Sequence, residues 1–221
     1  MKKFWNIRER PQAPWPSKTW TLPPNSPPLK PRPYSMMVSQ TDLKLFKEKA
    51  AAVQMVIAEI ADLPAAFTYA ADLTAQQGGR VLAACGWQEP DRQALAEACR
   101  RTGVSLITEN LREHAADLHT AFTPADWGIA ATGSLVLDSS SEDLRLATML
   151  AETHVAVLPL SRLRPDSEAL EADLVRVMES PPSYLAFITG ASRTADIERV
   201  LTIGVHGPRE LHVLILKDQE P

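Results

Sequence analysis

Glycines and ionisable side chains gather near the C-terminal end of the chain, in the segment ITGASRTADIERVLTIGVHGPRELHVLIL, residues 188–216. Apolar runs that are typical of buried strands begin and end this segment. Glycines permit tight turns and a close approach of ligand to backbone, while arginine, histidine and carboxylates can bind a ligand or exchange protons with it. A hydrophobic core does not require this composition, so the segment is the first candidate for a functional site.

The first part of the segment, TGASRTADIE, has the pattern of an anion site. We expect a strand over 184–189 to end at Gly190, and a helix to begin near Arg193 or Thr194. The free amides of a first helical turn and the guanidinium of Arg193 would both favour a carboxylate or phosphate. This is where the sequence predicts that a negative charge is held.

Helix capping is an alternative explanation for the same residues. Ser192 or Thr194 would cap the helix, and Asp196 and Glu198 would complement its dipole. Capping does not require an arginine at the mouth of the loop, so both interpretations stay open. If the protein is a catalyst, Asp196, Glu198 and His206 are the candidates for proton transfer.

The second part, GVHGPRE, predicts an irregular loop before the last strand, because Gly204, Gly207 and Pro208 interrupt regular structure. His206 lies inside this loop, where it could donate to a ligand oxygen or act as an acid or base near neutral pH. The alternative is a histidine satisfied by neighbouring backbone groups. Gly207 and Arg209 complete the predicted ligand-binding residues of this loop.

A third loop, AATGSLVLD, places Thr132, Gly133 and Ser134 before a strand. Their hydroxyls and amides could face the same pocket as the other two loops. The pattern by itself has low specificity, because glycine and serine are common in turns.

Short apolar strands and amphipathic helices must position these loops. From about residue 37 to 218 the two alternate, which indicates an α/β domain with a mostly parallel sheet covered by helices. In such sheets ligands bind beyond the carboxyl ends of the strands, so we expect the three loops to meet there. The expected helices are 41–61, 65–77, 91–103, 143–151, 166–179 and 192–201. The expected strands are 80–85, 104–108, 133–138, 154–160, 183–189 and 210–216.

Residues 1–36 differ from this domain, 37–221, in composition and charge. The first 35 residues hold nine of the 18 prolines and a charge of +6, which leaves −10 for the remainder. Three interpretations are open for this arm: a proline-rich ligand for a partner, a packed arm, or a start codon assigned upstream of Met36 or Met37. The acidic body argues against nonspecific nucleic-acid binding.

The two cysteines, Cys85 and Cys99, limit the possible cofactors. They are too few to ligate an iron–sulfur cluster or a four-cysteine zinc site in one chain, and they provide no disulfide framework. We expect no metal or cofactor on this chain, and two small buried side chains instead. No apolar run reaches the length of a membrane span and no secretory signal is evident, so the expected location is the cytoplasm.

Three stretches, GIAATGSLVLD, HVAVLPLSRL and the segment 188–216, resemble the LUD-domain family, specifically its lactate utilization protein C type. The resemblance implies the fold shared by ribose-5-phosphate isomerase, glucosamine-6-phosphate deaminase and coenzyme A transferases. It also implies a role in oxidising L-lactate to pyruvate together with two partner proteins that carry iron–sulfur clusters. This chain would be the cluster-free subunit or an accessory protein.

One position departs from the family pattern A-E-T-G-[ST], because Ala131 stands where the family has glutamate. If that carboxylate contributes to a pocket, this chain lacks it. The leading hypothesis is a subunit that binds a small anionic ligand at the mouth of the three loops. The alternative is an autonomous phosphosugar- or acyl-transfer-type enzyme of the same fold, and the absence of one candidate nucleophile at Ala131 counts modestly against an acyl-transfer version.

Overall fold

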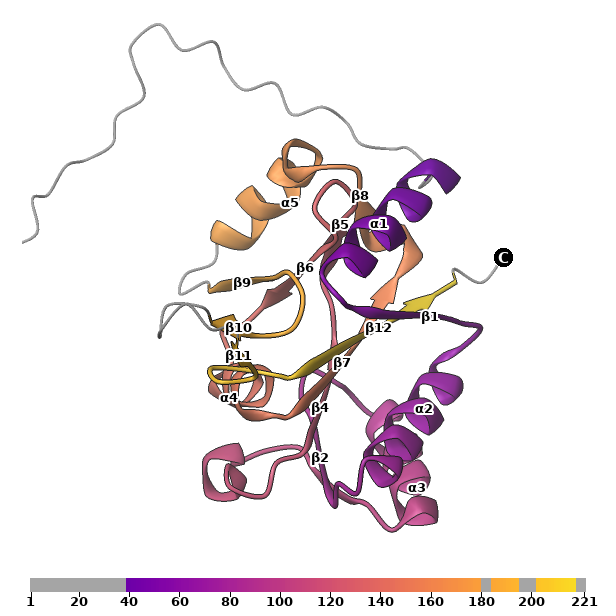
Figure 1. Ribbon diagram of the computed structural model, residues 1–221, viewed down its shortest axis with the longest axis vertical. Helices are drawn as coiled ribbons and strands as arrows, with labels where there is room; N and C mark the ends of the chain where they lie inside the picture. The colour runs from indigo at the N-terminus through magenta and orange to yellow at the C-terminus, as the bar shows by residue number, and fades with distance from the viewer. Residues whose placement is uncertain (1–38, 180–183, 195–201, 218–221) are drawn as a thin grey trace, which may run out of the picture. The chain divides into compact units, whose positions relative to one another are not determined.

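The computed structural model describes residues 39–179, 184–194 and 202–217 of the 221-residue chain (Figure 1). The arm predicted over residues 1–36 lies outside these ranges. None of the helices in the described ranges is both long and apolar enough to cross a lipid bilayer.

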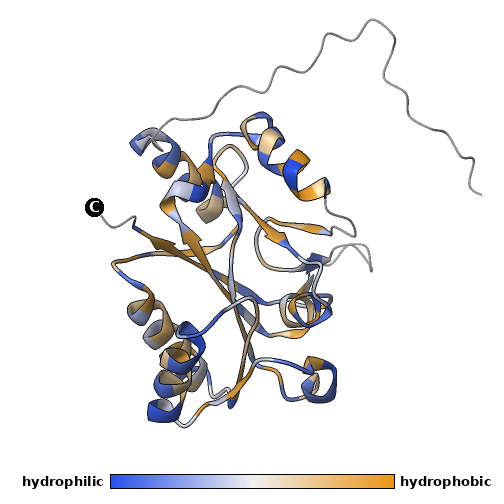
Figure 2. Cartoon of the chain, turned by 180° about the vertical axis from the view of Figure 1, so that it is seen from behind, coloured by the Kyte–Doolittle hydropathy of each residue, from blue (hydrophilic) through white to orange (hydrophobic). Residues whose placement is uncertain are grey.

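A six-stranded, fully parallel sheet forms the centre of the molecule. Its four inner strands are mostly buried runs of apolar residues, as expected for a parallel sheet that is covered on both faces, while the edge strands are partly exposed. Figure 2 shows the central strands coloured mainly as hydrophobic. In spatial order they are β1 (Val56–Ile60), β12 (Glu210–Leu216), β7 (Thr153–Pro159), β4 (Thr120–Pro124), β2 (Val81–Ala84) and β3 (Ser105–Ile107).

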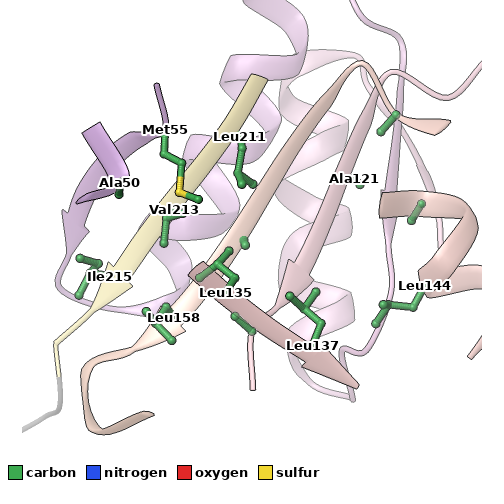
Figure 3. Close-up of a cluster of buried hydrophobic side chains, with 14 of the residues drawn as sticks. Ala50, Met55, Ala121, Leu135, Leu137, Leu144, Leu158, Leu211, Val213 and Ile215 are labelled. Carbon is green, nitrogen blue, oxygen red and sulfur yellow. The ribbon is translucent and has the colours of Figure 1, made fainter. Parts of the chain in front are cut away.

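Different layers cover the two faces of this sheet. Helices α2 (Leu63–Gln76) and α3 (Asp91–Thr102) pack on one face, around Phe67 and Leu95. The other face holds a larger cluster, drawn in Figure 3 with Ala50, Leu135, Leu144 and Val213 among its members. That cluster is closed by α1 (Gln40–Ala52), α4 (Glu142–Leu150) and a second sheet.

The second sheet has four strands in the order β8-β5-β6-β9 and carries α5 (Ser167–Met178). A small core around Trp127, Val136 and Leu170 lies between this sheet and α5. Its strands are β8 (Leu163–Arg164), β5 (Trp127–Ile129), β6 (Ser134–Asp138) and β9 (Leu185–Ile188). Two 3₁₀ turns, η2 (Leu111–His114) and η3 (Leu160–Arg162), and a short ribbon, β10 (Arg193–Thr194) with β11 (Thr202–Ile203), complete the described structure.

The predicted α/β class with a mostly parallel, helix-covered sheet is confirmed. The helix predicted over 41–61 is wrong in its second half, since α1 ends at Ala52 and β1 begins at Val56. Gln54, with a φ of 62°, lies between them in the left-handed region and breaks the helix. The apolar spacing at 53–60 fits a buried strand as well as a helix, and only the sheet decides between them.

A second correction concerns the helix predicted to begin at Arg193 or Thr194. Both residues are in β10, which pairs antiparallel with Thr202 and Ile203. The first helical turn, whose amides were to bind an anion there, is therefore absent at these two positions. Residues 195–201 of the predicted helix lie outside the described residues.

The two cysteines are buried in the cores on opposite faces of the central sheet. Burial raises the pKa of the Cys85 thiol to about 12 and that of Cys99 to about 11, so both stay protonated at neutral pH. We expect iodoacetamide to leave the native chain unlabelled and to label both thiols after urea unfolding, measured by intact mass. Rapid labelling of the folded chain would show that one thiol is exposed and ionisable.

Candidate functional site

Two of the three predicted loops are brought together by the antiparallel pairing of β6 with β9, which sets Leu135 opposite Ile188. Ser134 at the start of β6 then lies beside Thr189, just after β9, with 2.6 Å between their hydroxyl oxygens. The Thr132 hydroxyl is 2.8 Å from that of Ser134. We call these three side chains, Thr132, Ser134 and Thr189, the hydroxyl cluster.

The hydroxyl cluster is fixed against the C-terminal end of α1 by two glycines. Gly133 has a φ of +64°, and a Cβ atom there would lie 2.6 Å from the backbone nitrogen of Ala50. Gly190 has a φ of +83°, and its Cβ would lie 2.8 Å from the carbonyl oxygen of Val53. Both the backbone conformation and the close approach require glycine.

Arg193 joins the same end of α1. Its Nη2 donates to the carbonyl oxygen of Val53 at 2.7 Å and to Oε1 of Gln54 at 3.0 Å. The bond to Val53 satisfies a carbonyl left open by the end of the helix, and a cation is favourable at that end of the dipole. Arg193 thus has a structural role, and both bonds use one nitrogen of an exposed guanidinium.

The remaining predicted loop, GVHGPRE, forms a separate hollow with the end of α4. This hollow has a volume of about 340 Å³ and opens to solvent. We call it the α4 hollow, and its lining residues are Met149, Leu150, Ala151, Glu152, Gly204, Val205, His206, Gly207 and Arg209. It therefore gathers His206, Gly207 and Arg209 of the predicted site, and His206 is exposed there.

The α4 hollow lies at the opposite edge of the central sheet from the one we predicted. Its loops lead into the starts of β12 and β7, where Arg209 N donates to the carbonyl oxygen of Glu152 at 2.7 Å. Parallel strands begin at a common edge, so this is the amino edge. The hydroxyl cluster belongs to the mixed second sheet, to which the carboxyl-end rule does not apply.

Ser192 connects the hydroxyl cluster region to the α4 hollow. Its amide donates to the carbonyl oxygen of Pro208 at 2.8 Å, and its carbonyl oxygen accepts from the amide of Gly204 at 2.9 Å. Gly207 fits closely over it, since a Cβ on Gly207 would lie 3.2 Å from Cβ of Ser192. The predicted residues thus form two neighbouring groups joined through Ser192.

Thr194 remains apart from these contacts, because it pairs with Thr202 in the ribbon. The predicted positions Asp196 and Glu198 lie outside the described residues. Ala131 is exposed immediately before the hydroxyl cluster, and its amide donates to the carbonyl oxygen of Pro165 at 2.9 Å. Among the residues the structure describes, no three His, Cys, Asp or Glu side chains are placed to hold a metal ion.

A polar network that sequence reasoning missed lies on the α2 face of the central sheet. The Tyr69 hydroxyl is 2.8 Å from Nδ1 of His212, whose Nε2 is 3.1 Å from a carboxylate oxygen of Glu210. Gln77 donates to the same Glu210 carboxylate oxygen at 2.8 Å. Burial raises the pKa of Tyr69, and the charge of Glu210 adds to this effect. The network ties α2 to β12, and no local signal reveals it because Tyr69 and His212 are 143 residues apart.

Comparisons with known proteins connect this architecture to a family. Residues 36–216 match the family model of the LUD domain. "Lactate utilization protein C" of Halalkalibacterium halodurans is 31% identical over 142 residues, which cover 60% of this chain and 62% of that protein. "Lactate utilization protein C" of Geobacillus kaustophilus is 35% identical over 98 residues, 43% of this chain and 41% of that protein.

In both relatives the match covers less than two thirds of the relative's own length. A crystal structure of a DUF162 family protein from Deinococcus radiodurans superposes with a TM-score of 0.52 at 18% identity, over 80% of this chain and 96% of that one. That superposition shows that the two proteins share a fold. The family model covers most of the chain, including the hydroxyl cluster and the α4 hollow, and the chain belongs to the LUD domain family.

Proposed function

We propose that this chain acts in lactate utilization as the cluster-free subunit of an L-lactate-oxidising complex, with two partner proteins that carry iron–sulfur clusters. The observation that carries the proposal is the similarity to proteins named for lactate utilization in several organisms. The chain has two cysteines, both buried, and a cluster commonly takes four thiolates. The clusters of such a complex would therefore belong to the partner proteins.

The hydroxyl cluster and Arg193 suit a small hydroxycarboxylate. Hydroxyl groups can both donate to and accept from the hydroxyl of such a ligand, and a guanidinium pairs with its carboxylate. Ser134 is buried at the centre of the cluster, while Thr132, Thr189 and Arg193 are exposed to an incoming ligand. Gly133 and Gly190, which lie close against the end of α1, hold these groups in place before a ligand arrives, and this lowers the entropy lost on binding.

The pathway proposal is tested by affinity capture of the full chain from cells grown on L-lactate. We expect two iron–sulfur proteins in the eluate and L-lactate-dependent dye reduction that the chain alone lacks. D-lactate in the same assay is the control for substrate specificity. Capture of the chain without partners, from cells that consume lactate, would contradict the subunit role and favour an autonomous enzyme.

The ligand site is tested separately by thermal unfolding of the purified chain with added L-lactate. Thr132→Val removes the exposed end of the hydroxyl cluster, and Arg193→Gln removes the cation, so each is expected to weaken binding by about tenfold. Arg112→Gln is the matched control, because Arg112 is an exposed arginine paired with Glu142 on another part of the surface. If L-lactate stabilises all four proteins equally, or none of them, the hydroxyl cluster is not its site.

A further inference from the structure

We propose that the α4 hollow is a second binding site, for an amphiphilic carboxylate: a ligand with an apolar acyl or aryl body and one carboxylate head. The site differs from the hydroxyl cluster in its residues, its sheet edge and its chemistry. The proposal does not depend on the lactate role.

The body of the ligand would lie on an apolar wall. Met149, Leu150 and Val205 line the hollow, with exposed fractions of 58%, 45% and 46%. The described residues include nine exposed large hydrophobic side chains, and a third of them are collected here by the last turn of α4 and the loop before β12. Exposed apolar side chains gathered in a concave site mark a place where apolar surface of a ligand can be buried.

The guanidinium of Arg209 would bind the carboxylate head of the ligand. Arg209 faces Glu152 at 3.9 Å, and the two side chains are 68% and 60% exposed. An exposed pair at that separation contributes little, so the Arg209 fork can form a closer, bidentate contact with a ligand carboxylate. His206, exposed in the same hollow, supplies a ring nitrogen that can donate to the second carboxylate oxygen.

The loop that carries these groups is held from several sides. Gly204 donates to the carbonyl oxygen of Ser192, Ser192 to that of Pro208, and Arg209 to that of Glu152. Gly204 also has a φ of +76°, and a Cβ there would overlap Cγ of Arg209, so the arginine stem lies across the glycine. The wall and the cation are thus placed in advance, as expected of a binding site rather than a loose turn.

The size of the hollow indicates the class of ligand. At about 340 Å³ it is comparable to the lower end of small-molecule sites. A three-carbon hydroxy acid fills about 100 Å³, judged against the roughly 30 Å³ that one water takes in the liquid, and would leave the apolar wall uncovered. A longer acyl or aryl acid covers the wall and reaches Arg209 together.

The test is titration of the ¹⁵N-labelled full chain with 4-phenylbutyrate, followed by amide NMR shifts, with 4-phenylbutyramide and acetate as matched probes. The butyrate is expected to shift the backbone amides of residues 149–152, 204–207 and 209. It is also expected to bind at least about tenfold more tightly than 4-phenylbutyramide, which lacks the charge, or acetate, which lacks the apolar body.

Three variants separate the proposed contacts. Arg209→Gln is expected to weaken the binding of 4-phenylbutyrate about tenfold and to leave the binding of 4-phenylbutyramide unchanged. Glu152→Gln removes an anion that competes for Arg209, so it is expected to strengthen the binding of 4-phenylbutyrate. Arg112→Gln, another exposed ion-paired arginine, leaves both unchanged. Equal binding of butyrate and amide, shifts confined to other residues, an Arg209 variant that binds like the parent, or no saturable shift at all would overturn the proposal.

Discussion

Replacing Gly133 with alanine is expected to lower the free energy of unfolding by about 3–5 kcal/mol, because two penalties coincide at this residue. Its φ of +64° lies in the left-handed region, where an L side chain is strained. The new Cβ would also lie 2.6 Å from the backbone nitrogen of Ala50 and 2.8 Å from the carbonyl carbon of Lys49. Backbone atoms of a packed helix cannot move aside as a flexible side chain can, so α1 and β6 must separate.

The matched controls are Gly78→Ala and Gly103→Ala. These glycines have φ values of +78° and +73°, and a Cβ on either meets nothing within 4 Å. Each control therefore carries the backbone strain alone and is expected to destabilise by about 1–2 kcal/mol. Urea unfolding of the three variants measures the difference. A Gly133 variant as stable as the controls would show that α1 does not press on this loop.

The Gly133 variant also connects folding to the proposed ligand site. Gly133 stands between Thr132 and Ser134, so a shift of the loop moves both hydroxyls away from Thr189. We expect this variant, but neither control, to lose stabilisation by L-lactate while it is still folded. The two measurements together distinguish a site that depends on α1 from one that only neighbours it.

The sequence predicts β2, β3, β7 and β12 of the central sheet because each is a short apolar run next to an amphipathic helix. It misses β4 (Thr120–Pro124), for which no strand was predicted. Prediction fails where one pattern fits two structures, as at residues 53–60, whose apolar spacing is compatible with α1 continuing and with β1. It also fails at Arg193 and Thr194, where polar residues after a glycine suggested a helix start and pairing with Thr202 and Ile203 formed a ribbon instead. At residues 53–60 pairing with the distant strand β12 decides the structure, and at Arg193 and Thr194 pairing with the nearby residues Thr202 and Ile203 does.

The same limit applies to the site. Thr132, Gly133 and Ser134 were predicted from turn chemistry, but Thr189 was not, because the register of β6 against β9 is not encoded locally. Thr189 was already the last residue of a predicted strand, so knowledge of that strand pairing would have identified it. Arg193 was predicted as an anion-binding group, and its partner Val53, 140 residues away, shows that it also caps α1.

The loop of His206 shows a further reason why the sequence predicts the site only in part. Its glycines and proline correctly predicted irregular structure, but the sheet edge it occupies depends on which strand it precedes and how that strand is oriented. Because β12 runs parallel to β7, the loop meets the end of α4 at the amino edge. This geometry divides a single predicted pocket into the hydroxyl cluster and the α4 hollow, with different chemistry in each.

His154, which is buried in β7 beside Thr123 of β4, provides the other large effect. The side chain is 1% exposed, and its Nε2 is 2.9 Å from the hydroxyl oxygen of Thr123. Nδ1 has no hydrogen-bond partner among the described residues. Burial lowers the pKa of His154 from 6.5 to about 4, so the folded protein holds a neutral imidazole at pH values where an unfolded chain is protonated.

The free energy of unfolding is therefore expected to fall by about 3 kcal/mol between pH 6.5 and pH 4 on account of His154 alone. The contribution is complete above the unfolded pKa, declines as the unfolded chain takes up a proton, and is gone below the folded pKa. Urea unfolding at a series of pH values measures this contribution.

The double variant His154→Leu/Thr123→Val replaces both hydrogen-bonding partners with apolar groups and should flatten this part of the curve of unfolding free energy against pH. His114→Gln, at an exposed histidine, should keep the parent slope, and the carboxylates common to all three proteins cancel in the comparison. A parent and double variant with the same pH dependence would mean that His154 becomes protonated inside the folded protein at little cost.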